Sequence, residues 1–132
     1  MEMEIRFAGG MKVDAEFRGH VIHTDQPKEE GGDGSAPEPY TLFLASIGTC
    51  AGVYVLSFIK HHGLSAEGVR LVQRMHYDEV NHRMARIELK IIVPPTFPEK
   101  YQKAMVRSAE LCAVKRAITN PPEFAVSAVV EG

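Results

Sequence analysis

The chain has 132 residues, of which 45% are hydrophobic and 24% are charged, so it can bury a core of its own. Its formal net charge of -2, without any run of basic residues, argues against nucleic acid and anionic membranes as partners. We therefore expect one globular domain over residues 1–132. The opening MEMEIRFAGG lacks a basic segment followed by an apolar one, so we also expect a cytoplasmic protein without a secretory signal.

The sequence predicts three strands at the start of the chain. Apolar residues occupy every second position over 3–7 and again over 11–17, and Gly9-Gly10 between them predicts a hairpin with a two-residue turn. After Arg18-Gly19, the stretch HVIHT at 20–24 predicts a third strand. The stretch DQPKEEGGDGSAPE at 25–38 is rich in proline, glycine and acidic residues, which predicts a long exposed loop.

The next segment predicts one long central helix. Pro39 suits a first helical turn, and Gly63 should stop the helix after His61 or His62. Residues 39–59 carry no charge and are numerous enough to span a bilayer. A helix in the centre of a soluble core has the same appearance, and the flanking segments alternate as a soluble sheet does. We therefore expect a core helix.

Two more strands, a helix and a last strand follow. VRLVQRMHY at 69–77 and RMARIELKIIV at 83–93 alternate with period two and predict an antiparallel pair. From Pro98 to about Thr119 a helical stripe contains Tyr101, Met105, Ser108 and Cys112, and FAVSAVV at 124–130 predicts a final strand. The order β-β-β-α-β-β-α-β indicates an α+β fold with antiparallel sheets around the long central helix.

Small residues on the central helix suggest how copies of the chain associate. Ala45, Gly48, Thr49 and Gly52 recur at spacings of three and four, which lets another helix backbone approach closely. A domain of this size has few helices that can supply that partner. We therefore expect the same helix of a second copy, in an intertwined two-fold homodimer.

The chain has two cysteines, Cys50 in SIGTCAG and Cys112 in AELCAVKR. They are too few for a disulfide scaffold and lack the CxxC spacing of zinc or thioredoxin chemistry. Each can be a reagent or a small buried hydrophobe. Among the histidines, His20 and His23 point to opposite faces of a strand, and His61 and His62 to different faces of a helix, so we expect no metal site.

Two motifs resemble one family. PYTLFLASIGTC, with a proline eleven positions before a cysteine, and the later AELCAV resemble the OsmC-like family, which includes the organic hydroperoxide resistance proteins. GHVIHTDQPKEEGG and the order of elements are also similar to that family. The resemblance implies a homodimeric thiol peroxidase that uses no cofactor. In it Cys50 would be the peroxidatic thiolate and Cys112 the resolving thiol, and a dithiol reductant, which in the family can be a lipoylated protein, would reset the pair.

The chain departs from the family pattern near the reactive thiol. Cys50 lies too far into its helix for the N-terminal dipole to act, and burial would raise its pKa, so a nearby cation is required. Family members use an arginine from the N-terminal strands, held by a glutamate at the position that is Tyr40 here. Arg18 and Glu38 are the candidates that remain in this chain. Ala113 stands where a proline is common in the family.

Three further residues are candidates for a substrate pocket. Tyr54, Phe43 and Ile47 share the helical face of Cys50, and they would make an apolar pocket suited to an alkyl or aryl hydroperoxide. Such residues also belong to ordinary cores. A second function therefore stays open, in which the dimer binds a small hydrophobic ligand and the cysteines do not react.

Overall fold

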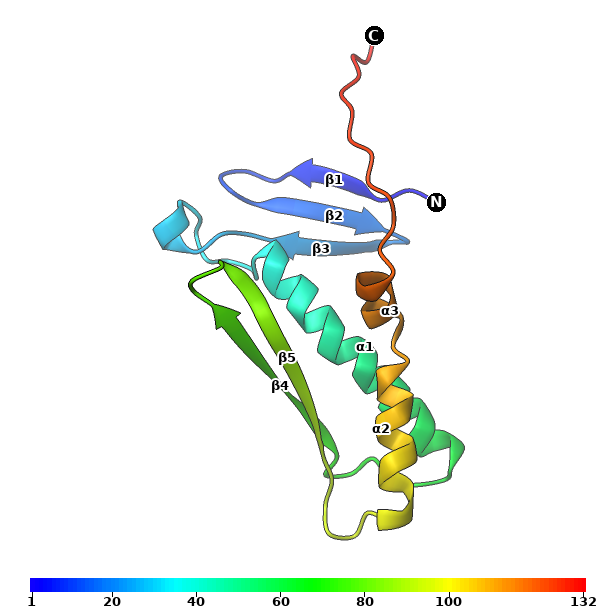
Figure 1. Cartoon of the computed structure of the whole chain (residues 1–132). Coiled ribbons are helices and arrows are strands. Elements are labelled where there is room, and N and C mark those ends of the chain that lie inside the picture. Colours follow the sequence, from blue (N-terminus) through cyan, green and yellow to red (C-terminus); the bar gives the residue numbers. More distant parts are fainter. The chain divides into compact units, whose positions relative to one another are not determined.

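The computed structural model describes all 132 residues, which divide into two compact units, Met1–Ser46 and Ile47–Gly132. The first unit contains β1 (Glu4–Phe7), β2 (Val13–Phe17) and β3 (His20–Thr24). These strands form an antiparallel sheet in the order β1-β2-β3 (Figure 1). The three strands agree with the prediction from the sequence.

The turns of this sheet differ from each other. Arg18 and Gly19 form the two-residue connection from β2 to β3 with φ of 49° and 79°, which is typical of a type I′ hairpin turn. The connection from β1 to β2 is longer than the predicted two-glycine turn. It spans residues 8–12, because the Ala8 N–H donates to the Lys12 carbonyl and Phe7 pairs with Val13.

The predicted loop at 25–38 is organised around one buried carboxylate. Asp25, only 1% exposed, accepts hydrogen bonds from the Ser35 hydroxyl at 2.6 Å and from backbone N–H groups of Ser35, Gln26 and Asp33 at 3.0, 2.8 and 3.3 Å. These bonds, led by that of the Ser35 hydroxyl, lower the Asp25 pKa to about 2. The loop also contains one 3₁₀ turn, η1 (Lys28–Glu30). The predicted loop is therefore present, but it has a fixed internal structure.

The long helix α1 (Pro39–His61) has the predicted bounds, begins in the first unit and continues through the second. It buries one stripe in steps of four residues, which contains Ile47, Ala51, Val55 and Ile59. Its length and composition would allow it to cross a membrane, although the core helix of a folded domain meets the same criteria.

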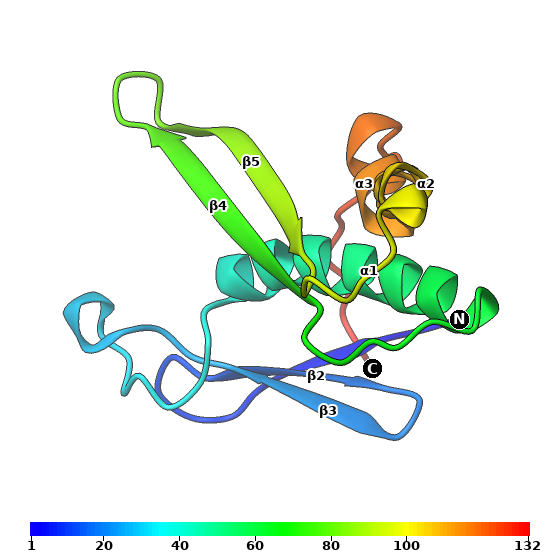
Figure 2. The same cartoon turned by 90° about the horizontal axis from the view of Figure 1, so that it is seen from below.

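The second unit also contains a long hairpin of β4 (Arg70–Asp78) and β5 (Arg83–Ile92), which pair antiparallel as predicted. Figures 1 and 2 show this hairpin and α2 (Gln102–Glu110) beside α1. Val55 and Ile59 of α1 pack with Phe97 and with Met105 of α2, and side chains of both strands cover this cluster. The core of this unit therefore lies where α1, the hairpin and α2 meet.

The predicted single helix from Pro98 to Thr119 is wrong. A short 3₁₀ turn, η2 (Glu99–Tyr101), leads into α2, and α3 (Ala113–Thr119) follows as a separate helix (Figure 1). Between them Cys112 adopts φ of -58° and ψ of 140°, which no α-helix allows. The Cys112 sulfur accepts the N–H of Lys115 at 3.3 Å and caps α3. A helix therefore ends just before the second cysteine, and another begins directly after it.

The predicted last strand is not formed in the single chain. Residues 121–132 contain neither helix nor strand, and Phe124, Val126 and Val130 are 83%, 98% and 97% exposed. A strand needs a neighbour that supplies backbone hydrogen bonds, and this segment has none within the chain.

The predicted helix contact requires the small residues of α1 to lie together on one free face. They do not. A Cβ atom at Gly48 would lie 2.5 Å from Oε1 of Gln73, so Gly48 faces strand β4. A Cβ atom at Gly52 would meet no atom within 4 Å. Gly48 therefore lets the hairpin approach α1, whereas Gly52 is open. The homodimer itself stays a prediction.

Candidate active site

The two cysteines meet in the second unit. Cys50 is partly buried near the middle of α1, and Cys112, only 1% exposed, lies at the break between α2 and α3. Both are free thiols, and the Cys112 thiol hydrogen-bonds the sulfur of Cys50. The structure thus brings together residues that are 62 positions apart in the chain.

The surroundings of Cys50 favour its thiolate form. Its pKa is lowered, first because the backbone N–H of Val114 donates to the sulfur. Burial acts in the opposite direction. The N–H of Ala113, the Cys112 thiol and the positive charge of Arg116 add to the lowering. A sulfur that accepts several hydrogen bonds near a cation is suited to act as a nucleophile at neutral pH.

Arg116 is tied to the helix that carries Cys50. Its Nη2 donates to the hydroxyl of Tyr54 at 3.4 Å, and Tyr54 lies one helical turn after Cys50 on α1. Arg116 lies four residues after Cys112, in the helix α3 that Cys112 caps. The guanidinium is therefore anchored near both cysteines.

A cavity of about 370 Å³ lies beside Cys112 in the second unit. Most of its lining is aliphatic, and the side chains come from α1, both strands of the hairpin, α2 and α3. The lining residues are Ile47, Leu71, Ile87, Leu89, Ile91, Val106, Ala109, Glu110, Cys112, Lys115 and Ile118. The cavity is thus apolar, with one carboxylate and one ammonium group, and Cys50 does not line it.

The three residues proposed for a substrate pocket separate in the structure. Ile47 lines the cavity, and Tyr54 contacts Arg116 instead. Phe43 is 41% exposed, and its ring centroid lies 5.6 Å from that of Tyr40. The structure therefore does not gather these three residues in one pocket.

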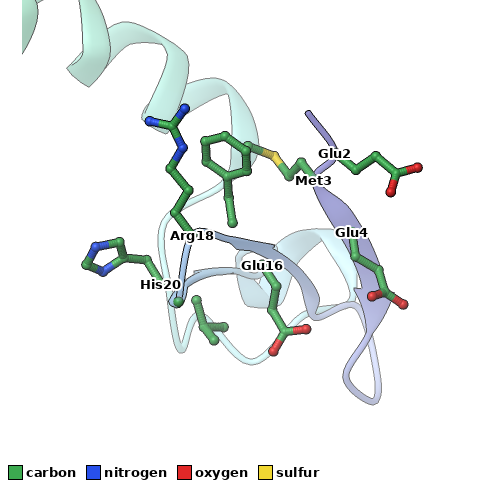
Figure 3. Close-up of a pocket in the computed structure, with 9 residues that line it drawn as sticks. Glu2, Met3, Glu4, Glu16, Arg18 and His20 are labelled. Carbon is green, nitrogen blue, oxygen red and sulfur yellow. The ribbon is translucent and has the colours of Figure 1, made fainter.

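Arg18 and Glu38 belong to the first unit. The Arg18 guanidinium lies 4.9 Å from the ring centroid of Phe17 and donates to the Met1 sulfur at 3.8 Å. It lines a cavity of about 580 Å³ with residues of β1, β2 and β3, and it points away from the carboxylates of Glu4 and Glu16 (Figure 3). Glu38 uses its backbone carbonyl to accept the N–H of Leu42 at the start of α1. No ion pair joins Arg18 to Glu38.

Sequence reasoning missed Arg116 and the donors that precede it. The stripe from Tyr101 to Cys112 suggested one continuous helix, and a continuous helix uses its N–H groups for its own hydrogen bonds. The break at Cys112 frees the N–H groups of Ala113 and Val114 for Cys50. The signal in the sequence was a basic residue four positions after the second cysteine.

Two of the six histidines, His23 and His76, lie close to a carboxylate. His23 Nδ1 lies 3.1 Å from Asp14 Oδ1, and His76 Nε2 lies 3.2 Å from Glu88 Oε1. No cluster of three or more histidine, cysteine or carboxylate residues is arranged to hold a metal ion.

Comparison with known protein families gives one match. The family model described as OsmC-like protein matches residues 32–127. This range contains both cysteines, Arg116 and the whole lining of the apolar cavity. No curated protein sequence matches the chain.

Solved structures match the fold over most of its length. A Psychrobacter arcticus protein, named for osmotic stress induction and the detoxification response, has a TM-score of 0.73 at 19% identity and covers 87% of this chain and 85% of its own. The organic hydroperoxide resistance protein OsmC of Legionella pneumophila has a TM-score of 0.55 at 20% identity and covers 89% of each chain. A Vibrio cholerae protein named for organic hydroperoxide resistance, with captopril bound in one of its active sites, has a TM-score of 0.56 at 16% identity and covers 92% of this chain and 86% of its own. At these identities the likeness establishes the fold.

Proposed function

Because the chain belongs to the OsmC-like protein family, we propose that it is a cysteine-based peroxidase that reduces organic hydroperoxides. Membership of this family suggests a redox or peroxide-resistance role. The observation that carries the proposal is the Cys50 sulfur, which contacts Cys112 and has a lowered pKa. An inert pair of core cysteines would need no such set of donors.

The proposed reaction uses the two sulfurs in turn. The Cys50 thiolate attacks one oxygen of the hydroperoxide, the O–O bond breaks, and an alcohol leaves after it gains a proton. Cys50 is then a sulfenic acid. The Cys112 thiol condenses with it to a disulfide and releases water, which protects Cys50 from further oxidation. A dithiol reductant, of which a lipoylated protein is one example, restores both thiols.

In this proposal Arg116 is the cation that activates Cys50 within the subunit. Its charge favours the thiolate, and its bond to Tyr54 holds it beside α1. Arg18, with Glu38, is a second candidate activator. The Arg18 guanidinium contacts the Phe17 ring and the Met1 thioether and forms no ion pair with a carboxylate. Its positive charge is therefore not neutralised by a neighbouring carboxylate, which supports Arg18 as a candidate.

We further propose that the protein acts as a cytoplasmic homodimer. On α1, Val53 and Leu56 are 60% and 41% exposed, and the space beside Gly52 is open. The apolar segment at 124–130 is exposed in the single chain and pairs with no strand. Exposed apolar surface of this kind is typical of an interface that a second copy covers.

The apolar cavity supports a second candidate function. A lining that is mostly aliphatic, with few polar groups, is usual for sites that bind small hydrophobic ligands. In this alternative the fold and the dimer are kept, the cysteines do not react, and the cavity holds the ligand.

Single-turnover assays with cumene hydroperoxide separate the two functions. The fully reduced protein should consume about one equivalent of peroxide within seconds and form a Cys50–Cys112 disulfide, seen by peptide mass. Cys50→Ser should consume none, and Cys112→Ser should consume peroxide once and leave a sulfenic acid that dimedone traps. If the peroxide persists with the wild-type protein and both thiols stay free, the peroxidase proposal fails for this substrate.

A further inference from the structure

The two thiols of the candidate site are held next to each other by different elements. Cys50 lies near the middle of α1, and Cys112 lies at the break where its sulfur caps α3. Both cysteines are free, and the Cys112 thiol hydrogen-bonds the Cys50 sulfur. Because the fold has already brought the two sulfurs together, a ligand that bridges them meets a preorganised site.

Two adjacent thiols match the coordination chemistry of trivalent arsenic. Arsenic(III) is a soft centre that prefers thiolate sulfur to oxygen or nitrogen, and it forms three bonds in a pyramid. In an arsenical with one carbon substituent, the other two bonds go to exchangeable hydroxyl groups, which two neighbouring sulfurs can replace. The chain has two cysteines and no cluster of three or more metal-binding side chains. It therefore suits a ligand that needs two sulfurs better than a metal ion that needs three or four protein ligands.

The apolar cavity offers a place for the carbon substituent. Cys112 lines this cavity of about 370 Å³, and Ile47, Leu89 and Ile118 are among the aliphatic side chains around it. An aryl or alkyl group on an arsenic atom that is bound to the Cys112 sulfur can therefore enter apolar surroundings. Its burial removes apolar surface from water, which stabilises the complex.

We propose that Cys50 and Cys112 form a chelating site for trivalent arsenicals with one apolar carbon substituent, which the apolar cavity receives. The proposal requires only two free, adjacent thiols, so it is independent of the proposed peroxidase function. In a peroxidase that uses both sulfurs, the bound arsenical is also an inhibitor, because it occupies the two reacting groups.

Binding exchanges ligands on arsenic without any change of oxidation state. Each of the two arsenic–oxygen bonds breaks, and an arsenic–sulfur bond forms in its place, one to Cys50 and one to Cys112. Each departing hydroxide takes up a proton, from the thiol that replaces it or, for a thiolate, from solvent. Two water molecules leave, the arsenic–carbon bond stays intact, and no oxidant or reductant is required.

The first experiment tests the chelate with phenylarsine oxide, which hydrates in water to the dihydroxy form. After incubation with the fully reduced protein and gel filtration, mass spectrometry should show one phenylarsenic group per chain. Neither cysteine should then react with N-ethylmaleimide until 2,3-dimercaptopropanol removes the arsenic.

Single-cysteine variants are the controls for this result. Cys50→Ser and Cys112→Ser should each bind at least about a hundredfold more weakly in competition with 2,3-dimercaptopropanol, because one thiol cannot chelate. Serine is itself a good helix N-cap, so Cys112→Ser should keep α3. Equal binding by either variant, or a wild-type complex in which one cysteine still reacts with N-ethylmaleimide, would overturn the proposal.

The second experiment tests the place of the substituent. Ala109→Leu fills the cavity, whereas Ala117→Leu adds the same side chain at an exposed site on α3 outside the lining. Ala109→Leu should weaken the binding of phenylarsine oxide about tenfold and that of methylarsonous acid, whose substituent is small, by less than about threefold. Ala117→Leu should leave both affinities unchanged. Equal weakening for the two arsenicals in Ala109→Leu, or none, would contradict the placement in the cavity.

A comparison of two ligands decides the same point on the wild-type protein if Ala109→Leu fails to fold. Phenylarsine oxide should bind at least about tenfold more tightly than its 4-carboxyphenyl analogue, because the carboxylate would lose its hydration in apolar surroundings. Equal affinities would mean that the substituent stays in water, and the proposed use of the cavity would be wrong.

Discussion

Gly48 sets the distance between α1 and the β4–β5 hairpin, and Gly48→Ala is the perturbation that tests this role. Its α-hydrogen side faces Gln73 of β4, and a Cβ atom there would lie 2.5 Å from Oε1 of Gln73 and 3.8 Å from Cδ2 of Leu89. Leu89 also lines the apolar cavity. The contact at Gly48 therefore bears on the wall of the cavity that Cys112 also lines.

Two opposing terms give the expected size of the effect. Alanine in the middle of a helix is favoured over glycine by about 1 kcal/mol. Against this, the Gln73 amide must move by roughly 1 Å to reach an ordinary contact distance of about 3.5 Å. Overpacking of this kind costs about 1–3 kcal/mol. The free energy of unfolding should therefore stay unchanged or fall by up to about 2 kcal/mol.

A double-mutant cycle isolates the contact. In a Gln73→Ala background the obstacle is gone, so Gly48→Ala should raise the free energy of unfolding by about 1 kcal/mol and Tm by about 4 °C. Unfolding is measured in urea and by heat at one protein concentration for all four proteins. An interaction free energy below about 0.5 kcal/mol would mean that the two residues act independently, which would refute the packing of Gly48 on β4.

Three other changes have definite expected results. Arg116→Ala should raise the Cys50 pKa and slow its alkylation by iodoacetamide at pH 7 by about two- to tenfold, with Arg107→Ala as control; equal rates would contradict the role of Arg116. The pKa of Asp25 is lowered from 3.8 to about 2, so its contribution to stability is present above about pH 4 and lost as the pH falls through 2. Urea unfolding at pH 7 and 2 should show this loss in the wild type but not in Asp25→Asn. Val126→Lys should shift the sedimentation of the protein toward monomer, whereas Ser127→Lys, on the opposite face of an extended segment, should not, and equal effects would contradict a strand at the interface.

Most of the fold could be predicted from local patterns in the sequence. The alternation over residues 3–17 and 69–93 indicates which face of those strands is apolar, and Pro39 and Gly63 mark the ends of α1. The break before α3 was not visible in the same way. The spacing of Tyr101, Met105, Ser108 and Cys112 continues smoothly across it, and only the backbone of Cys112 reveals that the helix stops.

The two cysteines of the candidate site could be predicted from the sequence, whereas Arg116 could not. Cys50 stands out because it lies in the uncharged segment 39–59, and both Cys50 and Cys112 lie in motifs that resemble those of the family. The importance of Arg116 depends on the turn at Cys112, which a periodic pattern does not show. At 124–130 the sequence has a clear β-strand propensity, but no strand forms in the single chain. A strand forms only where a neighbouring strand offers backbone hydrogen bonds.

The bare segment at 124–130 also affects how the protein behaves in a test tube. FAVSAVV is uncharged, rich in β-branched residues and free of proline, which is the composition of segments that seed intermolecular β-aggregates. In the homodimer that we propose, a chain that loses its partner would expose this segment, so dilution and heat should favour irreversible precipitation over simple unfolding. Storage at high protein concentration, which would keep the proposed dimer associated, is then expected to be the milder condition, contrary to the usual practice for aggregation-prone proteins.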